Sequence, residues 1–322
     1  MISVVIPVYR SEANIPDLLR ALVSLHADLG GDLEVVFVVD GSPDRSYALL
    51  RSALPDQPFR SKLLLLSRNF GSFAAIRAGL AQASGEFLAV MAADLQEPPE
   101  LILRFREALA AGDCDVVLGT REGRQDPLLS RMSSKAFWWF YRRFVQRGMP
   151  AGGLDVFACT RAFADQLLKL QEANSSLVGL VVWLGYRSKT LAYHRQVRQA
   201  GKSAWTFTKK WKYLFDSLFA FTDLPLRLLS FLGTSAVACA IIISVVAIAS
   251  RLAGRIPVQG YTVTVVLIMF FGGINALGVS LIGGYLWRAF DNTKARPNYL
   301  VAGIDVFPPA GTVPRSNDGP TH

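Results

Sequence analysis

The sequence predicts an α/β protein with a mostly parallel sheet, followed by interfacial helices and two transmembrane helices. Two observations support this prediction. Short apolar segments alternate with amphipathic ones through residues 2–119, which is typical of parallel strands covered by helices on both faces. Closer to the C-terminus, residues 231–250 and 257–287 contain no charged side chain, and each matches or exceeds the roughly 20 apolar residues that span a bilayer core.

The predicted elements follow one another without long gaps. The first strand covers residues 2–8, and an amphipathic helix follows over residues 12–29. The second strand, residues 33–39, ends in the turn cluster DGSPD, whose Ser42 or Asp44 can cap a helix that begins near Arg45. Further strands and helices alternate over residues 62–66, 73–83, 86–92, 98–111 and 114–119.

The apolar segments divide the chain into four parts. We expect an α/β domain over residues 1–205 and amphipathic interfacial helices over residues 206–230. Two transmembrane helices with a short loop follow over residues 231–287. The C-terminal segment, residues 288–322, is expected to be disordered after about residue 302. Lys209, Lys210 and Lys212 precede the first span, and Arg288 and Lys294 follow the second. The positive-inside rule therefore places the α/β domain and both termini in the cytoplasm. The N-terminus enters a strand directly, so no signal peptide is expected.

Composition limits the classes of function. Hydrophobic residues make up 51% of the chain and charged residues 18%, with a mean hydropathy of +0.31, which is too apolar for an ordinary soluble protein. The net charge of +9 favours anionic lipid headgroups over nucleic acid, because the basic residues crowd toward the apolar segments. The three cysteines lack metal-ligand spacing. No dinucleotide or P-loop glycine motif follows the first strand, so dehydrogenases and P-loop NTPases lose their main support.

An acidic turn follows the strand predicted over residues 86–92. Asp94 and Gln96 lie there two residues apart, at the carboxyl end of a strand, where open α/β sheets bind ligands. One carboxylate and one amide oxygen suit Mg²⁺ that is held partly by substrate phosphates. The alternative is that residues 94–97 only cap the next helix, because acidic side chains favour helix N-termini.

The order of the motifs resembles a known family. The motifs that carry the resemblance are, in chain order, VVIPVYRSEANI, EVVFVVDGSPDRS, LSRNFGSFAAIRAGL, MAADLQEPPELI, VVLGTREGR, YHRQVRQAGKS, FTDLPLR and YLWRAFDNTKARPNYLV. They span roughly residues 2–301 and are similar to the polyprenyl-phosphate glycosyltransferases, an inverting group that includes dolichyl-phosphate mannose synthase and the bactoprenol glucosyltransferases. The resemblance implies a GT-A (Rossmann-like) catalytic domain over residues 1–205.

The resemblance also assigns the donor site. Positions matched to nucleotide-sugar binding in the family are Pro7, Tyr9, Glu12, Asp40, Asp94, Gln96 and Arg121. Of these, Asp94 and Gln96 would bind Mg²⁺ or Mn²⁺, and the catalytic residues would be Asp94, Arg121 and Asp155. Val39 and Ala92 stand where the family commonly has acidic residues, which implies weaker or more substrate-dependent metal binding.

The acceptor side is basic. Positions expected to bind the lipid phosphate are Arg131, Lys135, Arg195, Arg198 and Ser203. The segment RMSSKAFWWFYRRF lines the acceptor entrance or forms an interfacial helix, and the two interpretations are compatible. Asp155 either orients the acceptor or the sugar, or is a buried residue at a strand end. His194 is interpreted as structural.

The implied function is transfer of a hexose from a nucleotide diphosphate sugar to undecaprenyl phosphate on the cytoplasmic membrane face, with inversion. A UDP-sugar is the expected donor, with glucose as the first choice. One alternative is a processive membrane polysaccharide synthase, which the two spans and the lack of a Q-x-x-R-W motif disfavour. Another is a catalytically silent membrane scaffold of the same fold. The other expected partners are membrane lipids and a second copy of the chain, without nucleic acid.

Overall fold

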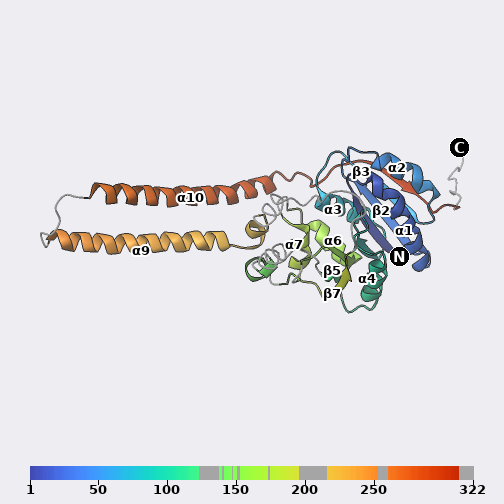
Figure 1. The fold of residues 1–322 in the computed structure, drawn as a ribbon, viewed down its shortest axis with the longest axis horizontal. Coiled ribbons are helices and arrows are strands. Elements are labelled where there is room, and N and C mark those ends of the chain that lie inside the picture. The colour runs from blue at the N-terminus through green and yellow to red at the C-terminus, as the bar shows by residue number, and fades with distance from the viewer. Residues whose placement is uncertain are drawn as a thin grey trace, which may run out of the picture. The chain divides into compact units, whose positions relative to one another are not determined.

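The computed structural model divides the chain into two compact units (Figure 1). Unit 1 comprises Met1–Lys210 and Pro297–His322, and unit 2 comprises Trp211–Arg296. Unit 1 contains a β-sheet with helices, and unit 2 contains two long helices. The residues that the structure describes are 1–122, 138–139, 141–146, 148–150, 153–172, 175–195, 216–252 and 260–311.

Unit 1 is organised around one sheet, which in the described part of the chain has eight strands in the order β7-β5-β6-β4-β1-β2-β3-β8. Their bounds are β1 Ile2–Val8, β2 Leu33–Val39, β3 Arg60–Leu66, β4 Phe87–Val90, β5 Val116–Glu122, β6 Val156–Thr160, β7 Ser188–His194 and β8 Val301–Phe307. The pairs β1–β2, β1–β4, β2–β3 and β5–β7 are parallel, whereas β6 and β8 pair antiparallel with their neighbours. The predicted α/β fold with a mostly parallel sheet is therefore confirmed.

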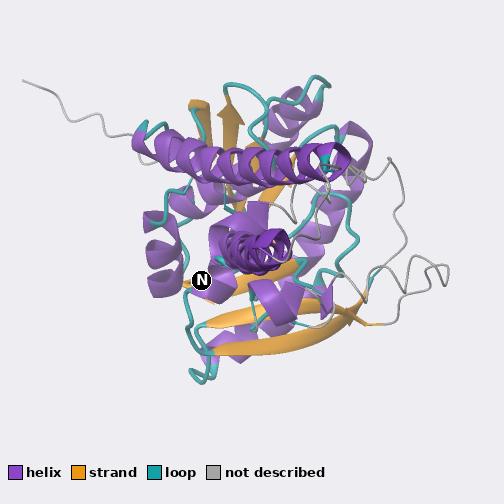
Figure 2. Cartoon of the chain, turned by 90° about the vertical axis from the view of Figure 1, so that its left-hand side faces the viewer, coloured by secondary structure: helices purple, strands orange, loops and turns teal. Residues whose placement is uncertain are grey.

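Helices cover both faces of this sheet (Figure 2). Their bounds are α1 Ile15–Asp28, α2 Ser46–Ala53, α3 Ser72–Gln82, α4 Glu100–Ala110, α6 Arg161–Lys169 and α7 Leu177–Trp183. Ile6 of β1 belongs to a buried cluster with Leu22 of α1 and Phe105 of α4. The helix predicted over residues 12–29 begins later, because Glu12–Asn14 form a 3₁₀ turn before it.

The opposite face of β1 and β2 lies close to α3. A Cβ atom on Gly79 would lie 2.2 Å from Val5 Cγ1 and 3.0 Å from Val38 Cγ2, so only glycine permits this approach of the helix backbone. Both faces of the two strands are thus buried, which explains why their sequences are continuously apolar instead of alternating.

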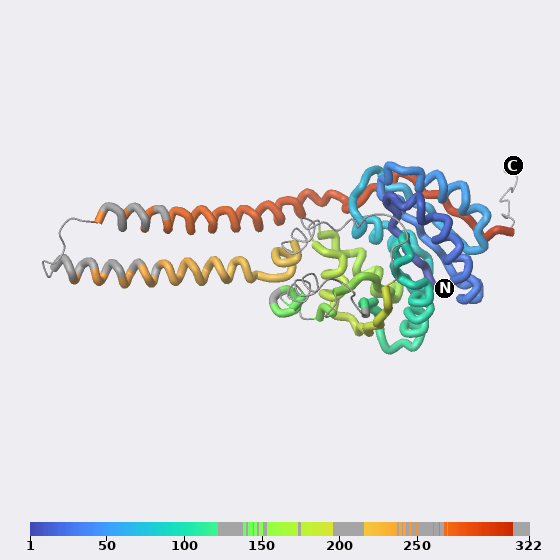
Figure 3. The backbone as a smooth tube through the Cα atoms, in the orientation of Figure 1, coloured from blue at the N-terminus to red at the C-terminus, as the bar shows by residue number. Residues whose placement is uncertain are grey.

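The segment predicted to be a disordered tail contains the last strand of the sheet. The expectation of disorder after about residue 302 is wrong for Val301–Phe307, which form β8 and pair antiparallel with β3. Tyr47 donates a hydrogen bond to Asp305 at 2.9 Å. Figure 3 shows this late segment in red among the blue N-terminal elements. Its polar and glycine residues resemble a linker in sequence, but backbone pairing with an existing strand orders them.

Unit 2 contains the two long helices α9 (Leu224–Leu252) and α10 (Tyr261–Thr293). Within the residues described, one helical segment, Phe270–Thr293, is long and apolar enough to cross a membrane. The span predicted over residues 231–250 lies in α9 and stays a prediction, so two spans are not confirmed.

Part of the predicted interfacial segment is also described. Residues 216–221 are helical, and Asp216 accepts a hydrogen bond from Arg288 at 2.7 Å. The Arg288 guanidinium lies 4.9 Å from the ring centre of Phe219. This short helix is therefore attached to α10 by an ion pair and by an aromatic contact.

At the amino-terminal edge of the sheet, Glu34 joins three strands. It is 3% exposed, and it accepts hydrogen bonds from Ser3 Oγ and from the Ser84 backbone at 2.6 Å. Lys62 Nζ lies 3.2 Å from its carboxylate. Burial raises the pKa of Glu34, but the hydrogen bonds and the Lys62 charge outweigh burial, so the net pKa lies below its ordinary value.

We expect Lys62→Met to destabilise unit 1 by about 3 kcal/mol, because it leaves a buried carboxylate without its cation. The melting temperature should fall by about 6 to 12 °C, whereas Lys62→Met combined with Glu34→Gln should recover most of the loss. An unchanged melting temperature in the single variant would contradict this account.

The same network predicts a pH dependence. Because the pKa of Glu34 is depressed in the folded state, its stabilisation is complete above the unfolded-state pKa of about 4.3. It is lost as the pH falls through the folded-state pKa. Melting curves of the natural protein and of Glu34→Gln should therefore converge in acid.

Candidate active site

The predicted site residues that the structure describes gather at one edge of the sheet. The carboxyl ends of β1, β2 and β4 are adjacent, because these strands are parallel neighbours. The end of β5, the start of the antiparallel β6 and the end of β7 lie at the same edge. The residues brought there are Pro7, Tyr9, Glu12, Asp40, Asp94, Gln96, Arg121, Asp155 and Arg195. The remaining four, Arg131, Lys135, Arg198 and Ser203, lie outside the described residues.

Glu12 joins the segments that follow β1 and β2. Its carboxylate accepts a hydrogen bond from the Arg45 backbone at 3.1 Å and pairs with the Arg45 guanidinium at 2.6 Å. In return, Asp44 accepts a hydrogen bond from the Glu12 backbone at 3.1 Å. These bonds hold the two loops together at the start of α2. The expected contact of Glu12 with the nucleotide sugar stays a prediction.

Tyr9 offers an accessible ring beside these loops. It is 42% exposed, and the Arg10 guanidinium lies 5.5 Å from its ring centre. Pro7 is half-buried at the end of β1. An exposed aromatic ring at a strand end can stack on a nucleobase.

Asp40 is buried and organises the neighbouring loop. Its two carboxylate oxygens accept hydrogen bonds from the backbone of Phe70 at 2.7 Å and of Gly71 at 2.8 Å. Gly41, at φ +55°, lets the backbone pass close to Arg68, where a Cβ would lie 2.4 Å from its carbonyl carbon. Asp40 therefore fixes the loop that begins α3, whereas its predicted contact with a nucleoside is untested.

The Asp94 turn contains a residue that the sequence interpretation missed. Asp94 Oδ1 accepts a hydrogen bond from the Gln96 backbone at 3.3 Å, and Leu95 has φ +52°. Glu97 is 6% exposed and accepts a hydrogen bond from the Ala92 backbone at 3.2 Å. Burial, and then the charge of Asp94, raise the pKa of Glu97. An acidic residue beside Gln96 was visible in the sequence, but its burial was not.

This turn supplies few oxygen ligands for a divalent cation. In the described part of the chain, no group of three or more His, Cys, Asp or Glu is placed to hold a metal. Gln96 Oε1 accepts a hydrogen bond from Arg195, so binding of a cation by Gln96 requires that Arg195 release it. The residues present fit Mg²⁺ or Mn²⁺ that takes one carboxylate from Asp94 and its other ligands from substrate phosphates and water.

Arg121 and Asp155, which were predicted separately, form one unit with Tyr193. Arg121 Nη2 donates to Asp155 Oδ1 at 2.9 Å, and its Nε pairs with Oδ2. The Tyr193 hydroxyl donates to Asp155 Oδ2 at 3.2 Å. Tyr193 is 3% exposed, and burial together with the charges of Asp155 and Glu97 raises its pKa, so it remains a neutral donor. Tyr193 gave no signal in the sequence beyond its place in a basic motif.

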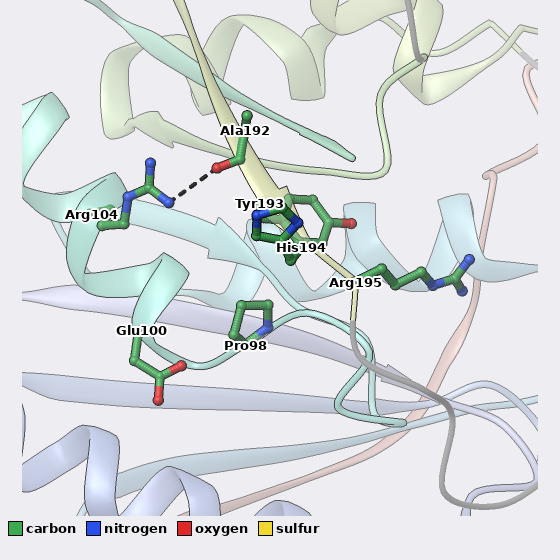
Figure 4. A pocket seen from close by; sticks show the side chains of 7 residues that line it. All are labelled: Pro98, Glu100, Arg104, Ala192, Tyr193, His194 and Arg195. Carbon is green, nitrogen blue, oxygen red and sulfur yellow. Dashed lines mark hydrogen bonds between the residues drawn. The ribbon is translucent and has the colours of Figure 1, made fainter. Parts of the chain in front are cut away.

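An open pocket of about 580 Å³ lies between the end of β7 and the start of α4. Its lining residues are Pro98, Glu100, Arg104, Ala192, Tyr193, His194 and Arg195. Arg104 donates to the Ala192 carbonyl at 3.1 Å, and Figure 4 shows the Arg195 guanidinium directed away from Glu100. Arg195, expected to bind a lipid phosphate, contacts Gln96 of the acidic turn.

The edge therefore combines an acidic turn with two guanidinium groups. Arg121 is held in place by a carboxylate, and Arg195 lies at the Asp94 turn. Arginine forks bind phosphate oxygens, and a carboxylate nearby can share a cation with the same phosphates. This arrangement suits an anionic ligand that carries a diphosphate.

Comparison with known proteins agrees with this chemistry. Residues 3–168 match the model of glycosyl transferase family 2. An uncharacterized glycosyltransferase of Synechocystis sp. is 31% identical over 311 residues, 95% of this chain and 97% of the relative. The putative glycosyltransferase CsbB of Bacillus subtilis is 31% identical over 318 residues, 99% and 95% of the two chains. Undecaprenyl-phosphate 4-deoxy-4-formamido-L-arabinose transferase of Salmonella paratyphi B is 32% identical over 309 residues, 95% and 94%. The family match covers more than half of the chain, so this protein belongs to glycosyl transferase family 2 and has its GT-A type of sheet.

Proposed function

We propose that this protein transfers a hexose from a nucleotide diphosphate sugar to undecaprenyl phosphate on the cytoplasmic face of a membrane, with inversion. The observation that carries the proposal is the meeting of the Asp94 turn with Arg121, Asp155 and Arg195 at one sheet edge. The Salmonella relative, whose name specifies undecaprenyl phosphate, aligns over both units and supports this class of acceptor. A UDP-sugar, with glucose first, is the proposed donor.

The donor would lie across the ends of β1, β2 and β4. Tyr9 would stack on the base, with Pro7, Glu12 and Asp40 beside the nucleoside. Asp94, with Gln96 once Arg195 releases it, would hold Mg²⁺ or Mn²⁺, which would neutralise charge on the diphosphate. Arg121 would stabilise the same leaving group, because a preorganised guanidinium costs little reorganisation when the charge develops.

The acceptor phosphate is already anionic near neutral pH, so a strong base is not required. One of its oxygens would attack the anomeric carbon of the sugar. As that bond forms, the bond from the carbon to the diphosphate oxygen breaks, and the electron pair leaves with the nucleotide. One displacement of an α-linked donor inverts the anomeric carbon. Asp155 would hold Arg121 in place, and Arg195, Arg198 and Ser203 would bind the lipid phosphate together with Arg131 and Lys135.

The membrane part of the proposal rests on the long apolar helices. Phe270–Thr293 is one candidate span, and we propose residues 231–250 of α9 as the other. The proposed division is a catalytic domain over residues 1–205, interfacial helices over 206–230, and a cytoplasmic segment after 287. Ala276, Ser280 and Gly284 recur at four-residue spacing in α10, which favours close packing with another helix and hence a homo-oligomer.

The test is transfer by the purified full-length protein. It is incubated with undecaprenyl phosphate and with radiolabelled UDP-sugars and GDP-sugars in turn, with and without Mn²⁺. We expect lipid-extractable label with one UDP-hexose, in a product that holds a single sugar. If no donor labels the lipid, the proposal fails, and a ladder of longer products would indicate a polysaccharide synthase.

Arg198→Ala tests the acceptor side separately. If Arg198 binds the lipid phosphate, its loss should raise KM for undecaprenyl phosphate about tenfold or more, because a charged hydrogen bond contributes about 1.5 to 3 kcal/mol. KM for the nucleotide sugar should stay the same. Arg60→Ala, a change at an exposed position at the start of β3, is the matched control. An unchanged KM for the lipid would remove Arg198 from the acceptor site.

A further inference from the structure

Among the described residues of the range 138–149, Gln146 and Gly148 lie against α7. Tyr141, Val145 and Met149 recur every four residues and are 0%, 9% and 1% exposed. Gln146 Nε2 donates to the Gly179 carbonyl at 3.0 Å, and a Cβ on Gly148 would lie 2.9 Å from Val182. The segment is therefore held on α7 by its inner side.

The outer sides of these two elements expose aromatic rings. Trp139 is 65% exposed, Trp183 at the end of α7 is 58% exposed, and Tyr186 is 39% exposed. Arg142 is exposed between the buried Tyr141 and Val145. We call Trp139, Arg142, Trp183 and Tyr186 the aromatic surface. Two ring contacts anchor this region, since Trp138 packs edge-on against Tyr141 and Tyr186 packs edge-on against Phe163, with ring centres 5.6 Å and 5.3 Å apart.

The charged residues of these two ranges, 138–149 and 175–187, are all basic. Neither residues 138–149 nor residues 175–187 contain an Asp or a Glu, whereas both contain Arg. In the second range Arg187 pairs with Asp115, so the positive charge comes from the first range, where Arg142 and Arg143 are both exposed. Exposed indole rings beside a guanidinium are costly in water, but they suit the interface of a bilayer, where the ring enters the headgroup layer and the cation meets lipid phosphate.

We propose that the aromatic surface binds the headgroup layer of a bilayer that contains anionic phospholipid. A bilayer is the favoured occupant because the two ranges combine exposed aromatic rings with positive charge and contain no acidic residue of their own, and because α10 contains a candidate membrane span. The inference depends on the proposed function only for the attachment of the chain to a membrane.

Spin-label accessibility in nanodiscs tests this contact on the full-length chain. Cys239→Ser removes the exposed cysteine, while Cys114 and Cys159 are buried. A nitroxide is then attached at Trp183→Cys, or at Ser52→Cys on the exposed side of α2 as the reference. The measured quantity is the ratio of the label's collision rate with oxygen to its collision rate with a water-soluble nickel complex. We expect this ratio to be several-fold higher at position 183 than at position 52. Equal ratios at the two positions would overturn the proposal.

Lipid composition supplies the second readout. With about a third of phosphatidylglycerol in place of phosphatidylcholine, the label at 183 should move deeper, and Arg142→Gln should weaken this response about fivefold. Strong coupling between labels on two chains, without contact with lipid, would show that a second copy covers the surface and would overturn the proposal. The measurement does not require sugar transfer. If the label is exposed to lipid but the protein transfers no sugar, the proposed function is rejected and this inference stands.

Discussion

Asp94→Asn is expected to lower kcat for sugar transfer by about a thousandfold. The amide keeps an oxygen that can accept the Gln96 backbone hydrogen bond now made at 3.3 Å, so the turn should keep its shape. The substitution removes the negative charge that would bind a divalent cation together with the diphosphate of the donor. The measurement is the initial rate at which label from a UDP-sugar enters the lipid phase.

Two comparisons make this prediction specific. Asp56→Asn removes an equivalent charge at an exposed position near the start of β3 and should leave the rate unchanged. Mn²⁺ binding in the presence of UDP should weaken in Asp94→Asn and persist in Asp56→Asn. Full activity in Asp94→Asn would exclude the Asp94 turn as the donor-diphosphate site.

Asp155→Asn should lower kcat by about a hundredfold. Asp155 accepts hydrogen bonds from both Arg121 and Tyr193, so its loss releases the guanidinium that would face the leaving group. A displacement of about 1 Å in a positioned group can cost this much in rate. KM for the nucleotide sugar should change far less than kcat, because the proposed nucleoside contacts lie at the ends of β1 and β2.

A double-mutant cycle shows whether Arg121 and Asp155 act together. Arg121→Gln combined with Asp155→Asn should be no slower than the worse single variant, because each change already disables the pair. Tyr193→Phe removes one hydrogen bond to the Asp155 carboxylate but leaves Arg121 paired with it, so it should cost about tenfold, less than Asp155→Asn. Additive losses from the two changes would show that Asp155 works independently of Arg121, as it would if it contacted the acceptor itself.

Local patterns in the sequence were sufficient for β1 to β5 and for the edge of the candidate site, whereas β6, β7 and β8 were not predicted. Strands such as Leu33–Val39 are buried on both faces, which makes their apolar runs easy to recognise. Asp40 and Asp94 stand out because a polar residue directly after such a run marks the carboxyl end of a strand. The alternation of elements predicted a mostly parallel sheet, and in such a sheet the carboxyl ends of the parallel strands share one edge.

Contacts between distant segments could not be predicted in this way. The antiparallel β6 lies between β4 and β5, and nothing in its five residues specifies that place. The pairing of Arg121 with Asp155 follows from this arrangement. In the sequence Glu97 looks like an ordinary acidic residue before a helix, yet its side chain is buried. The pairing of Arg121 with Asp155 and the burial of Glu97 both depend on which strands are neighbours in the sheet. Local patterns in one sequence do not give the order of strands.

The late position of β8 in the chain has a consequence for biosynthesis. Its residues pair with β3 from Ser61 opposite Phe307 to Leu66 opposite Val301, yet they follow α9 and α10 in the sequence. While the chain is being made on a ribosome, one backbone edge of β3 stays without its partner until translation has passed both long helices. A product truncated before residue 301 would keep that open edge, which invites pairing with other chains and aggregation. Completion of the sheet therefore requires that translation pass Phe307, the last residue of β8.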